Sequence, residues 1–179
     1  MKSMWKKIPS AATVAAFSLS LAAAPAPAAV DHSASKAAPL TVTAASASGD
    51  LATMRRLINQ ARRRAGRPAL RPNRVLRRAA ALKLRRIAAC GQFTHTPCGA
   101  PFTATFRAAG WRRGTMGENI AFGSSYLGAA PAIFQSWMNS PGHRANIMSR
   151  AFRYEGLAVR TVSLPGIGSV RVWAQAFGR

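Results

Sequence analysis

The sequence predicts an α+β fold, because two kinds of apolar periodicity divide the chain. Between residues 51 and 87, apolar side chains recur at the three- and four-residue spacing of amphipathic helices. From residue 156 to residue 177, β-branched and aromatic residues fill two runs on either side of a Leu-Pro-Gly-Ile-Gly turn, which indicates a hairpin. Helices first and strands late favour helices packed on the faces of a small antiparallel sheet. The chain has 179 residues, of which 49% are hydrophobic, enough for one core.

The N-terminal segment has the pattern of a secretory signal peptide, which we place at residues 1–29. Three lysines precede an apolar run from Ile8 to about Ala24, and a small-residue stretch follows. Overlapping A-x-A sites leave the cleavage position open, after Ala24, Ala26, Ala28 or Ala29. The apolar run is shorter than the ~20 residues of a membrane span and rich in Ala and Ser. We therefore expect secretion to the extracellular space or periplasm, with no transmembrane anchor after cleavage.

Residues 30–49 have no periodic apolar pattern and consist largely of Ala, Ser and Thr. Such a segment has too little apolar surface to offset its ordering entropy. We expect a disordered lead-in over residues 30–49, followed by a single domain over residues 50–179.

Capping and turn residues define the expected elements of this domain. Asp50 can cap a first helix that ends at Gly66, and Asn73 can cap a second helix that follows the proline-containing RPALRPN segment. Pro101 suits the first turn of a short helix that runs to Ala109. Helical spacing returns over residues 129–138, and the segment HRANIM after the Ser-Pro-Gly turn forms another short helical piece.

Basic residues far outnumber acidic ones, with 26 Lys and Arg against four Asp and Glu and a formal net charge of +22. Loss of the three signal-peptide lysines leaves 23 basic residues and a charge of +19. We expect both long helices to expose this charge and to attract polyanions, such as anionic lipid, lipopolysaccharide, teichoic acids or another cell-envelope polymer. No motif for sequence-specific nucleic-acid recognition is present. The charge comes chiefly from two series: Arg55, Arg56, Arg62, Arg63, Arg64 and Arg67, then Arg71, Arg74, Arg77, Arg78, Lys83, Arg85 and Arg86.

The two cysteines, Cys90 and Cys98, favour a disulfide, because exported proteins use paired cysteines in this way. The bridge closes a short loop around His95. By lowering the entropy of the unfolded chain, it stabilises the folded state by roughly 2.6 kcal/mol. It also restricts where His95 points. The alternative is a metal site in which His95 lies between two thiolates.

Two histidines and one glutamate, His95, Glu118 and His143, form the candidate site. The imidazoles of His95 and His143 can bind zinc. Glu118 can accept a hydrogen bond from the other ring nitrogen of an imidazole and so fix its tautomer and orientation. Catalytic zinc usually has three protein ligands, so two histidines predict weak binding. The same residues can serve as general acid and base, or can hold loops through hydrogen bonds and caps.

Other polar and aromatic residues are expected to be structural. We expect Glu155 to form a surface ion pair with an arginine, and Asn119 and Asn146 to bond loop backbones. Large aromatic side chains dominate core burial, which places four of them in the core: Trp111, Trp137, Trp173 and Phe177.

Taken in order, the segments FTH, GENIAFG, WMNSPGHRANIM, EGLAVRTV and VWAQAFG resemble the bacterial SCP-like extracellular branch of the CAP superfamily. This superfamily comprises the cysteine-rich secretory, antigen 5 and pathogenesis-related proteins. The resemblance runs from about Leu51 to Gly178 and implies an α-β-α sandwich with a cleft. It assigns His95, Glu118 and His143 to that cleft. The second glutamate of many eukaryotic members has no counterpart, because Asn139 or Ser140 stands there, so the resemblance does not imply a four-residue site.

Family members have been linked to sterol and lipid binding, and some to proteolysis. We expect a binding protein rather than an enzyme, with a ligand at the polar cleft and anionic envelope material on the basic surface. One alternative is a metal-assisted or acid/base hydrolase that uses the histidines and Glu118. It lacks a G-x-S-x-G nucleophile elbow, and Ser140 precedes a proline. Another is a cationic polyanion-binding or antimicrobial protein with a vestigial cleft. Zinc is the one cofactor considered, and no motif indicates an organic cofactor.

Overall fold

The computed structural model describes residues 44–112 and 114–179, so the predicted signal peptide and residues 30–43 of the lead-in lie outside it. Five α-helices and four strands are present in the described residues. In chain order they are α1 (Ala44–Arg64), β1 (Arg71–Pro72), α2 (Arg74–Cys90), α3 (Ala104–Ala109), β2 (Met116–Gly123), α4 (Ala130–Asn139), α5 (Pro141–Met148), β3 (Tyr154–Leu164) and β4 (Gly168–Gly178).

The four strands form one sheet in the order β1-β3-β4-β2. The predicted hairpin is confirmed as β3 and β4, which are antiparallel, and β2 adds to the other side of β4, also antiparallel. The two-residue β1 pairs in parallel with β3, so the sheet is mixed rather than purely antiparallel. Strand β2 lies at an edge of the sheet.

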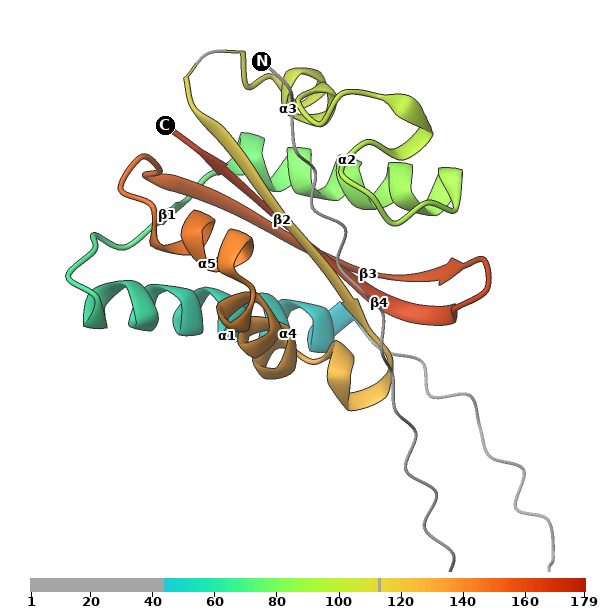
Figure 1. Cartoon of the computed structure of the whole chain (residues 1–179), viewed down its shortest axis with the longest axis horizontal. Coiled ribbons are helices and arrows are strands. Elements are labelled where there is room, and N and C mark those ends of the chain that lie inside the picture. The colour runs from blue at the N-terminus through green and yellow to red at the C-terminus, as the bar shows by residue number, and fades with distance from the viewer. Residues whose placement is uncertain (1–43, 113) are drawn as a thin grey trace, which may run out of the picture. The chain divides into compact units, whose positions relative to one another are not determined.

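Helices cover both faces of the sheet, which confirms the α-β-α sandwich. Figure 1 shows α2 and α3 on one side of the strands and α1, α4 and α5 on the other. Alternation along β4 supplies both cores, because successive side chains of a strand point to opposite faces. Val172 and Ala174 belong to the core under α2 and α3, whereas Trp173 and Phe177 belong to the core under α1 and α4. Trp137 is fully buried and Trp111 is partly buried.

Local signals set most element boundaries as expected. The Asn73 side-chain oxygen accepts from the amides of Val75 and Leu76 at 2.8 and 3.1 Å, which caps α2. Gly91 ends α2 in a left-handed conformation, with φ 62°. Pro101 was expected in the first turn of α3. That prediction is wrong, because Pro101 begins a separate turn and the helix starts at Ala104.

The start of α1 differs from the prediction. The helix begins at Ala44, so Asp50 lies inside it and is not its N-cap. The Asp50 carboxylate instead accepts from Arg171 Nη2 at 2.6 Å. The expected disorder is therefore wrong for residues 44–49, where alanine, the residue with the highest helix propensity, supports the helix.

Two basic residues that were expected on the solvated helix faces are buried. Arg62 and Lys83 are each 1% exposed. Each lies on the apolar stripe of its own helix, Arg62 at four-residue spacing after Met54 and Ile58, and Lys83 between Ala80 and Ile87. Their position on the apolar face of the helix therefore determines that these two side chains are buried, despite their charge. No helix in the described part of the chain is both long and apolar enough to cross a membrane.

Candidate functional site

The candidate site lies along the edge strand β2, where Glu118 meets the loop that follows α2. Glu118 is 7% exposed, and its Oε1 atom is 2.8 Å from His95 Nδ1 and 3.1 Å from Lys83 Nζ. A carboxylate only accepts hydrogen bonds, so His95 donates from Nδ1–H. This tautomer leaves the lone pair on Nε2 for a ligand. The His95 side chain is half exposed, so a ligand can reach it.

Lys83 is the member of the site that the sequence analysis missed. Its ammonium group donates to the backbone carbonyl of His95 as well as pairing with Glu118. It therefore neutralises the buried carboxylate and fixes the loop that carries His95. The signal was present in the sequence, because residue 83 lies on the apolar stripe of α2, where a lysine must find a partner.

The predicted disulfide between Cys90 and Cys98 is confirmed, with Cα atoms 5.7 Å apart. Because both sulfurs are bonded to each other, the alternative of a thiolate metal site around His95 is wrong. The Gln92 side chain also accepts from the Cys98 amide at 2.9 Å, inside the same loop. The loop that presents His95 is thus closed covalently and braced by a hydrogen bond.

His143 lies in α5, across β2 from the disulfide loop. Its Nδ1 atom is buried and has no hydrogen-bond partner in the described structure, and its ring lies 6.5 Å from the Trp137 ring between centroids. Burial lowers the His143 pKa below its usual value of 6.5, and the electrostatic interaction with the nearby His95 lowers this pKa further. The His143 imidazole is therefore neutral at pH 7. The two histidines therefore interact electrostatically, although no hydrogen bond joins them in the described residues.

Two asparagines hold α5 against the edge of the sheet. Asn146 Nδ2 donates to the backbone carbonyl of Glu118 at 3.2 Å and to Asn119 Oδ1 at 2.9 Å. Asn119 is fully buried, and its Nδ2 donates to the His143 carbonyl at 3.1 Å. The unpaired outer edge of β2 thus gains side-chain partners where His143 is anchored.

A buried polar chain continues from Asn119 through the sheet. Asn119 Nδ2 donates to Gln175 Oε1 at 3.5 Å, and Gln175 Nε2 donates to Glu155 Oε2 at 2.7 Å. Glu155 also pairs with Arg55 Nε at 3.2 Å. The arginine partner was expected, but the surface location is wrong, because Glu155 is fully buried. Burial raises the Glu155 pKa, against the opposing effects of the Gln175 hydrogen bond and of Arg55.

Metal binding at this site would rest on two imidazoles. In the part of the chain that the structure describes, no group of three or more His, Cys, Asp and Glu side chains could hold a metal ion. The orientation of His95 by Glu118 nevertheless matches the arrangement in which a carboxylate holds a metal-ligating histidine. Imidazole side chains such as those of His95 and His143 can bind a divalent ion, and two of them alone would hold it only weakly.

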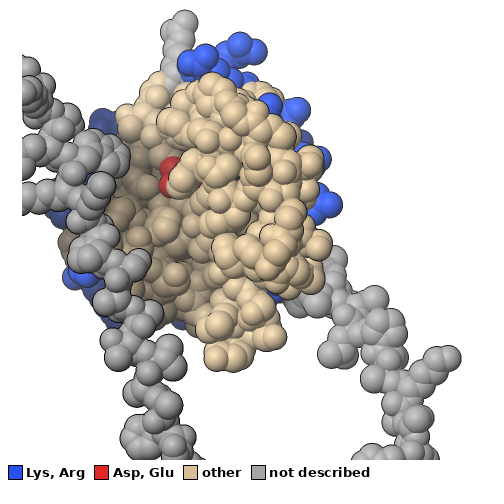
Figure 2. Space-filling model, turned by 45° about the vertical axis from the view of Figure 1, so that its right-hand side comes forward, with Lys and Arg blue, Asp and Glu red and all other residues tan. Residues whose placement is uncertain are grey.

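The surface around the sheet is unevenly charged. Figure 2 shows a face on which acidic atoms are visible at one small spot and Lys and Arg side chains lie towards the edges. Pockets of about 460 and 520 Å³ lie away from the two histidines, one beside Arg62 and Phe152 and one beside Val75 and Leu157. A ligand cleft at the histidines stays a prediction.

Comparison with known proteins identifies the family. The model of CAP, the Cysteine-rich secretory protein family, matches residues 55–166. The chain belongs to this family, as the sequence motifs indicated. A search of curated proteins gave no match.

Solved structures share the fold at low sequence identity. An outer surface protein from Borrelia burgdorferi has a TM-score of 0.61 and 16% identity, over 73% of this chain and 92% of that one. An extracellular protein containing an SCP domain from Bacillus anthracis has a TM-score of 0.63 and 22% identity, over 74% and 41%. A cysteine-rich secretory protein from Staphylococcus aureus has a TM-score of 0.58 and 19% identity, over 76% and 40%. The chain spans about two-fifths of the latter two proteins.

Proposed function

We propose that the protein is an exported binding protein. The His95–Glu118–His143 site holds a ligand, and the basic surface keeps the protein on anionic envelope material. The observation that carries the ligand site is the buried Lys83–Glu118 pair, which fixes the Nδ1 side of a half-exposed His95 and leaves Nε2 without a bond to Glu118. A site fixed before the ligand arrives spends less binding energy on ordering.

The contacts favour binding over catalysis. His143 Nδ1 has no hydrogen-bond partner among the described residues, so this nitrogen is not paired with Ser140 as a base would be with a nucleophile. Both cysteines are in the disulfide, and therefore no thiol can attack a substrate. The polar groups that remain accessible suit a ligand with hydroxyl or carbonyl groups, or a divalent cation.

Export is supported by the signal-peptide pattern and by the disulfide, which persists in oxidising compartments. The Bacillus anthracis neighbour is itself described as extracellular. Attraction to the envelope is supported by the charge of +19 that the chain keeps after loss of the three signal-peptide lysines.

Envelope binding is tested by co-sedimentation of the mature protein with phosphatidylglycerol vesicles at ~50 and ~500 mM NaCl. The fraction of protein that sediments with the vesicles should fall steeply between these salt concentrations, because salt screens the attraction between the basic surface and the anionic lipid. The His95→Ala, His143→Ala double variant should be retained as well as the parent. Retention that persists at high salt would contradict a surface held by charge.

A metal-assisted hydrolase is the second candidate, favoured by the hydrogen bond from His95 Nδ1 to Glu118. A bound divalent ion would supply Lewis-acid activation of water. His95 and His143 would hold it, while Glu118 fixes the His95 ring. Hydrolysis that depends on added zinc and on both histidines would establish this activity, whereas zinc binding without turnover would leave a binding site.

A further inference from the structure

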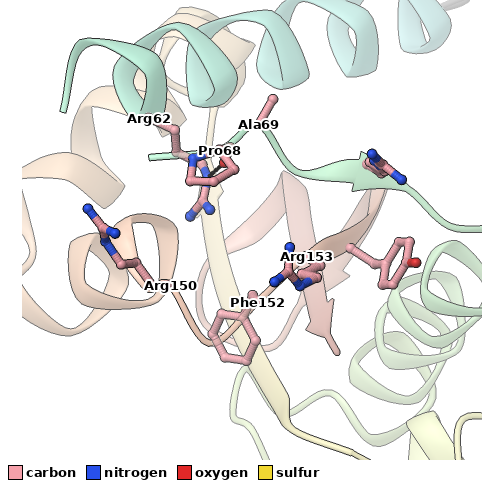
Figure 3. A pocket seen from close by; sticks show the side chains of 8 residues that line it. Arg62, Pro68, Ala69, Arg150, Phe152 and Arg153 are labelled. Atoms are coloured by element: carbon pink, nitrogen blue, oxygen red, sulfur yellow. Dashed lines mark hydrogen bonds between the residues drawn. The ribbon is translucent and has the colours of Figure 1, made fainter. Parts of the chain in front are cut away.

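A second site lies at the opposite end of α1 from Asp50, in a pocket whose charged residues are all arginines. The pocket has a volume of about 460 Å³ and is bounded by the end of α1, the loop before β1 and the segment between α5 and β3. Figure 3 shows Arg62 extending from α1 toward the space between Arg150 and Arg153. The lining residues are Arg62, Pro68, Ala69, Arg71, Arg150, Phe152, Arg153 and Tyr154.

Arg62 gives the pocket a rigid, buried donor. Its Nε donates to the Pro68 carbonyl at 2.8 Å, and its Nη1 donates to the Ile147 and Ser149 carbonyls at 2.5 and 2.9 Å. These bonds occupy Nε and Nη1, and Nη2 has no partner among the described residues. The side chain is thus held in place while one of its donor nitrogens remains available.

Two of the other lining arginines, Arg71 and Arg153, lie on backbone that is held by hydrogen bonds. The Arg71 amide donates to the Arg153 carbonyl at 2.9 Å, and the Arg153 amide donates to the Gly178 carbonyl at 3.1 Å. Phe152, which directly precedes Arg153, is buried and stacks on Phe177 with ring centroids 5.0 Å apart. The pocket therefore combines an apolar wall with guanidinium groups on well-anchored segments.

The pocket lacks a local counter-charge. Three acidic residues are described, and each has its own partner: Asp50 pairs with Arg171, Glu118 with Lys83 and His95, and Glu155 with Arg55. None of them lines the pocket. Glu155 does raise the pKa of Arg62, but burial and the nearby Arg67 lower it, with burial the largest effect. Clustered like charges in a concave site favour an anion as the missing partner.

We propose that this pocket binds a phosphate ester. Guanidinium groups match phosphate oxygens in geometry and charge, and an anion here would offset the repulsion between four lining arginines. The volume exceeds that of a bare ion and lies within the usual range for small organic ligands. Phe152 and Tyr154 would contact the organic part. The phosphate can belong to a soluble ester or to a lipid headgroup. This inference rests on the anion-binding part of the proposed function and assigns it one location.

The test is calorimetric titration of the mature protein with glycerol 3-phosphate, with inorganic phosphate and citrate as comparison anions. The pocket variant is Arg150→Gln, Arg153→Gln, because both side chains are exposed and Arg62 is needed for packing. The matched control is Arg107→Gln, Arg112→Gln, which removes the same charge from exposed residues outside the pocket. Circular dichroism checks that both variants fold.

Glycerol 3-phosphate should bind more tightly than inorganic phosphate or citrate. The pocket variant should bind it at least about tenfold more weakly, while the control changes less than about twofold. A parallel arm with phosphatidylglycerol and phosphatidylcholine vesicles distinguishes the sources. Loss of vesicle binding in the pocket variant alone, without binding of the soluble ester, identifies a headgroup site. Three results would overturn the pocket proposal. Both variants could bind glycerol 3-phosphate equally weakly, or citrate could bind as tightly as glycerol 3-phosphate. The pocket variant could also match the parent in both the soluble-ester and the vesicle experiments. If the parent still binds phosphatidylglycerol vesicles at low salt after the pocket proposal has failed, the proposed attraction to anionic envelope material stands. If the parent does not bind these vesicles at all, that part of the proposed function is overturned as well.

Discussion

Lys83→Met should be among the most damaging single substitutions outside the apolar core. The Lys83 and Glu118 side chains are 1% and 3% exposed, with Nζ 3.1 Å from Oε1. Removing one partner of a buried pair leaves an uncompensated charge and costs about 3–5 kcal/mol. For a domain of roughly 135 residues, whose unfolding entropy is about 0.28 kcal/mol/K, this corresponds to a fall in Tm of about 10–18 °C.

The assay is thermal and urea unfolding of the mature protein followed by circular dichroism. Arg78→Met, an exposed position on the same helix, is the matched control and should change stability by less than about 0.5 kcal/mol. The double variant Lys83→Met, Glu118→Leu should recover much of the loss, because an apolar pair can replace a buried ion pair. The reasoning is refuted if Lys83→Met unfolds like the parent, or if the double variant is no more stable than the single one.

Three further predictions follow from single contacts. His143 has a lowered pKa in the folded state, so the unfolded chain binds more protons; stability is complete above pH 6.5 and falls as pH drops through the folded pKa. Urea unfolding from pH 7.5 to 5 should show a smaller slope in His143→Gln, and an unchanged slope would contradict the assignment. Gly156→Ala places a Cβ 2.0 Å from the Arg77 nitrogen and should cost at least about 2 kcal/mol by chemical denaturation, whereas Gly142→Ala, which meets nothing within 4 Å, should be nearly neutral. Cys90→Ser with Cys98→Ser should lose about 2.6 kcal/mol and broaden the His95 ring signals in NMR spectra; sharp, unshifted signals would show that the disulfide does not position His95.

The sequence predicted the fold class and most helices because their signals are local. Asn73 capping α2, the turn after Leu164 and the periodicity of α4 each depend on a few neighbouring residues. The start of α1 was missed because Asp50 is a favourable N-cap residue, whereas the alanines before it signal a helix only through their propensity. Strand β1 was missed because its two residues gain strand character only by pairing with β3.

The candidate site was predicted only in part, because its remaining members depend on tertiary burial. His95, Glu118 and His143 were found from motif and composition, whereas Lys83 was counted with the surface charge. The same error placed Glu155 on the surface, although it lies one strand position before Gly156 and faces the buried Gln175. For Lys83 and Arg62, the sequence did carry a signal of burial, because both residues lie on the apolar stripe of their helices. No sequence signal joined Gln175 to Asn119, since that contact arises from the pairing of β2 with β4.

Zinc titration by calorimetry, with the mature parent beside the His95→Ala, His143→Ala double variant, tests most directly whether the two histidines form a binding site. The arrangement predicts saturable binding of one ion by the parent, weaker than the roughly 10–16 kcal/mol of structural zinc sites, and none by the double variant. Arg107→Gln, Arg112→Gln should bind zinc like the parent. Identical heats from the parent and the histidine variant would contradict the site and leave the histidines with a structural role.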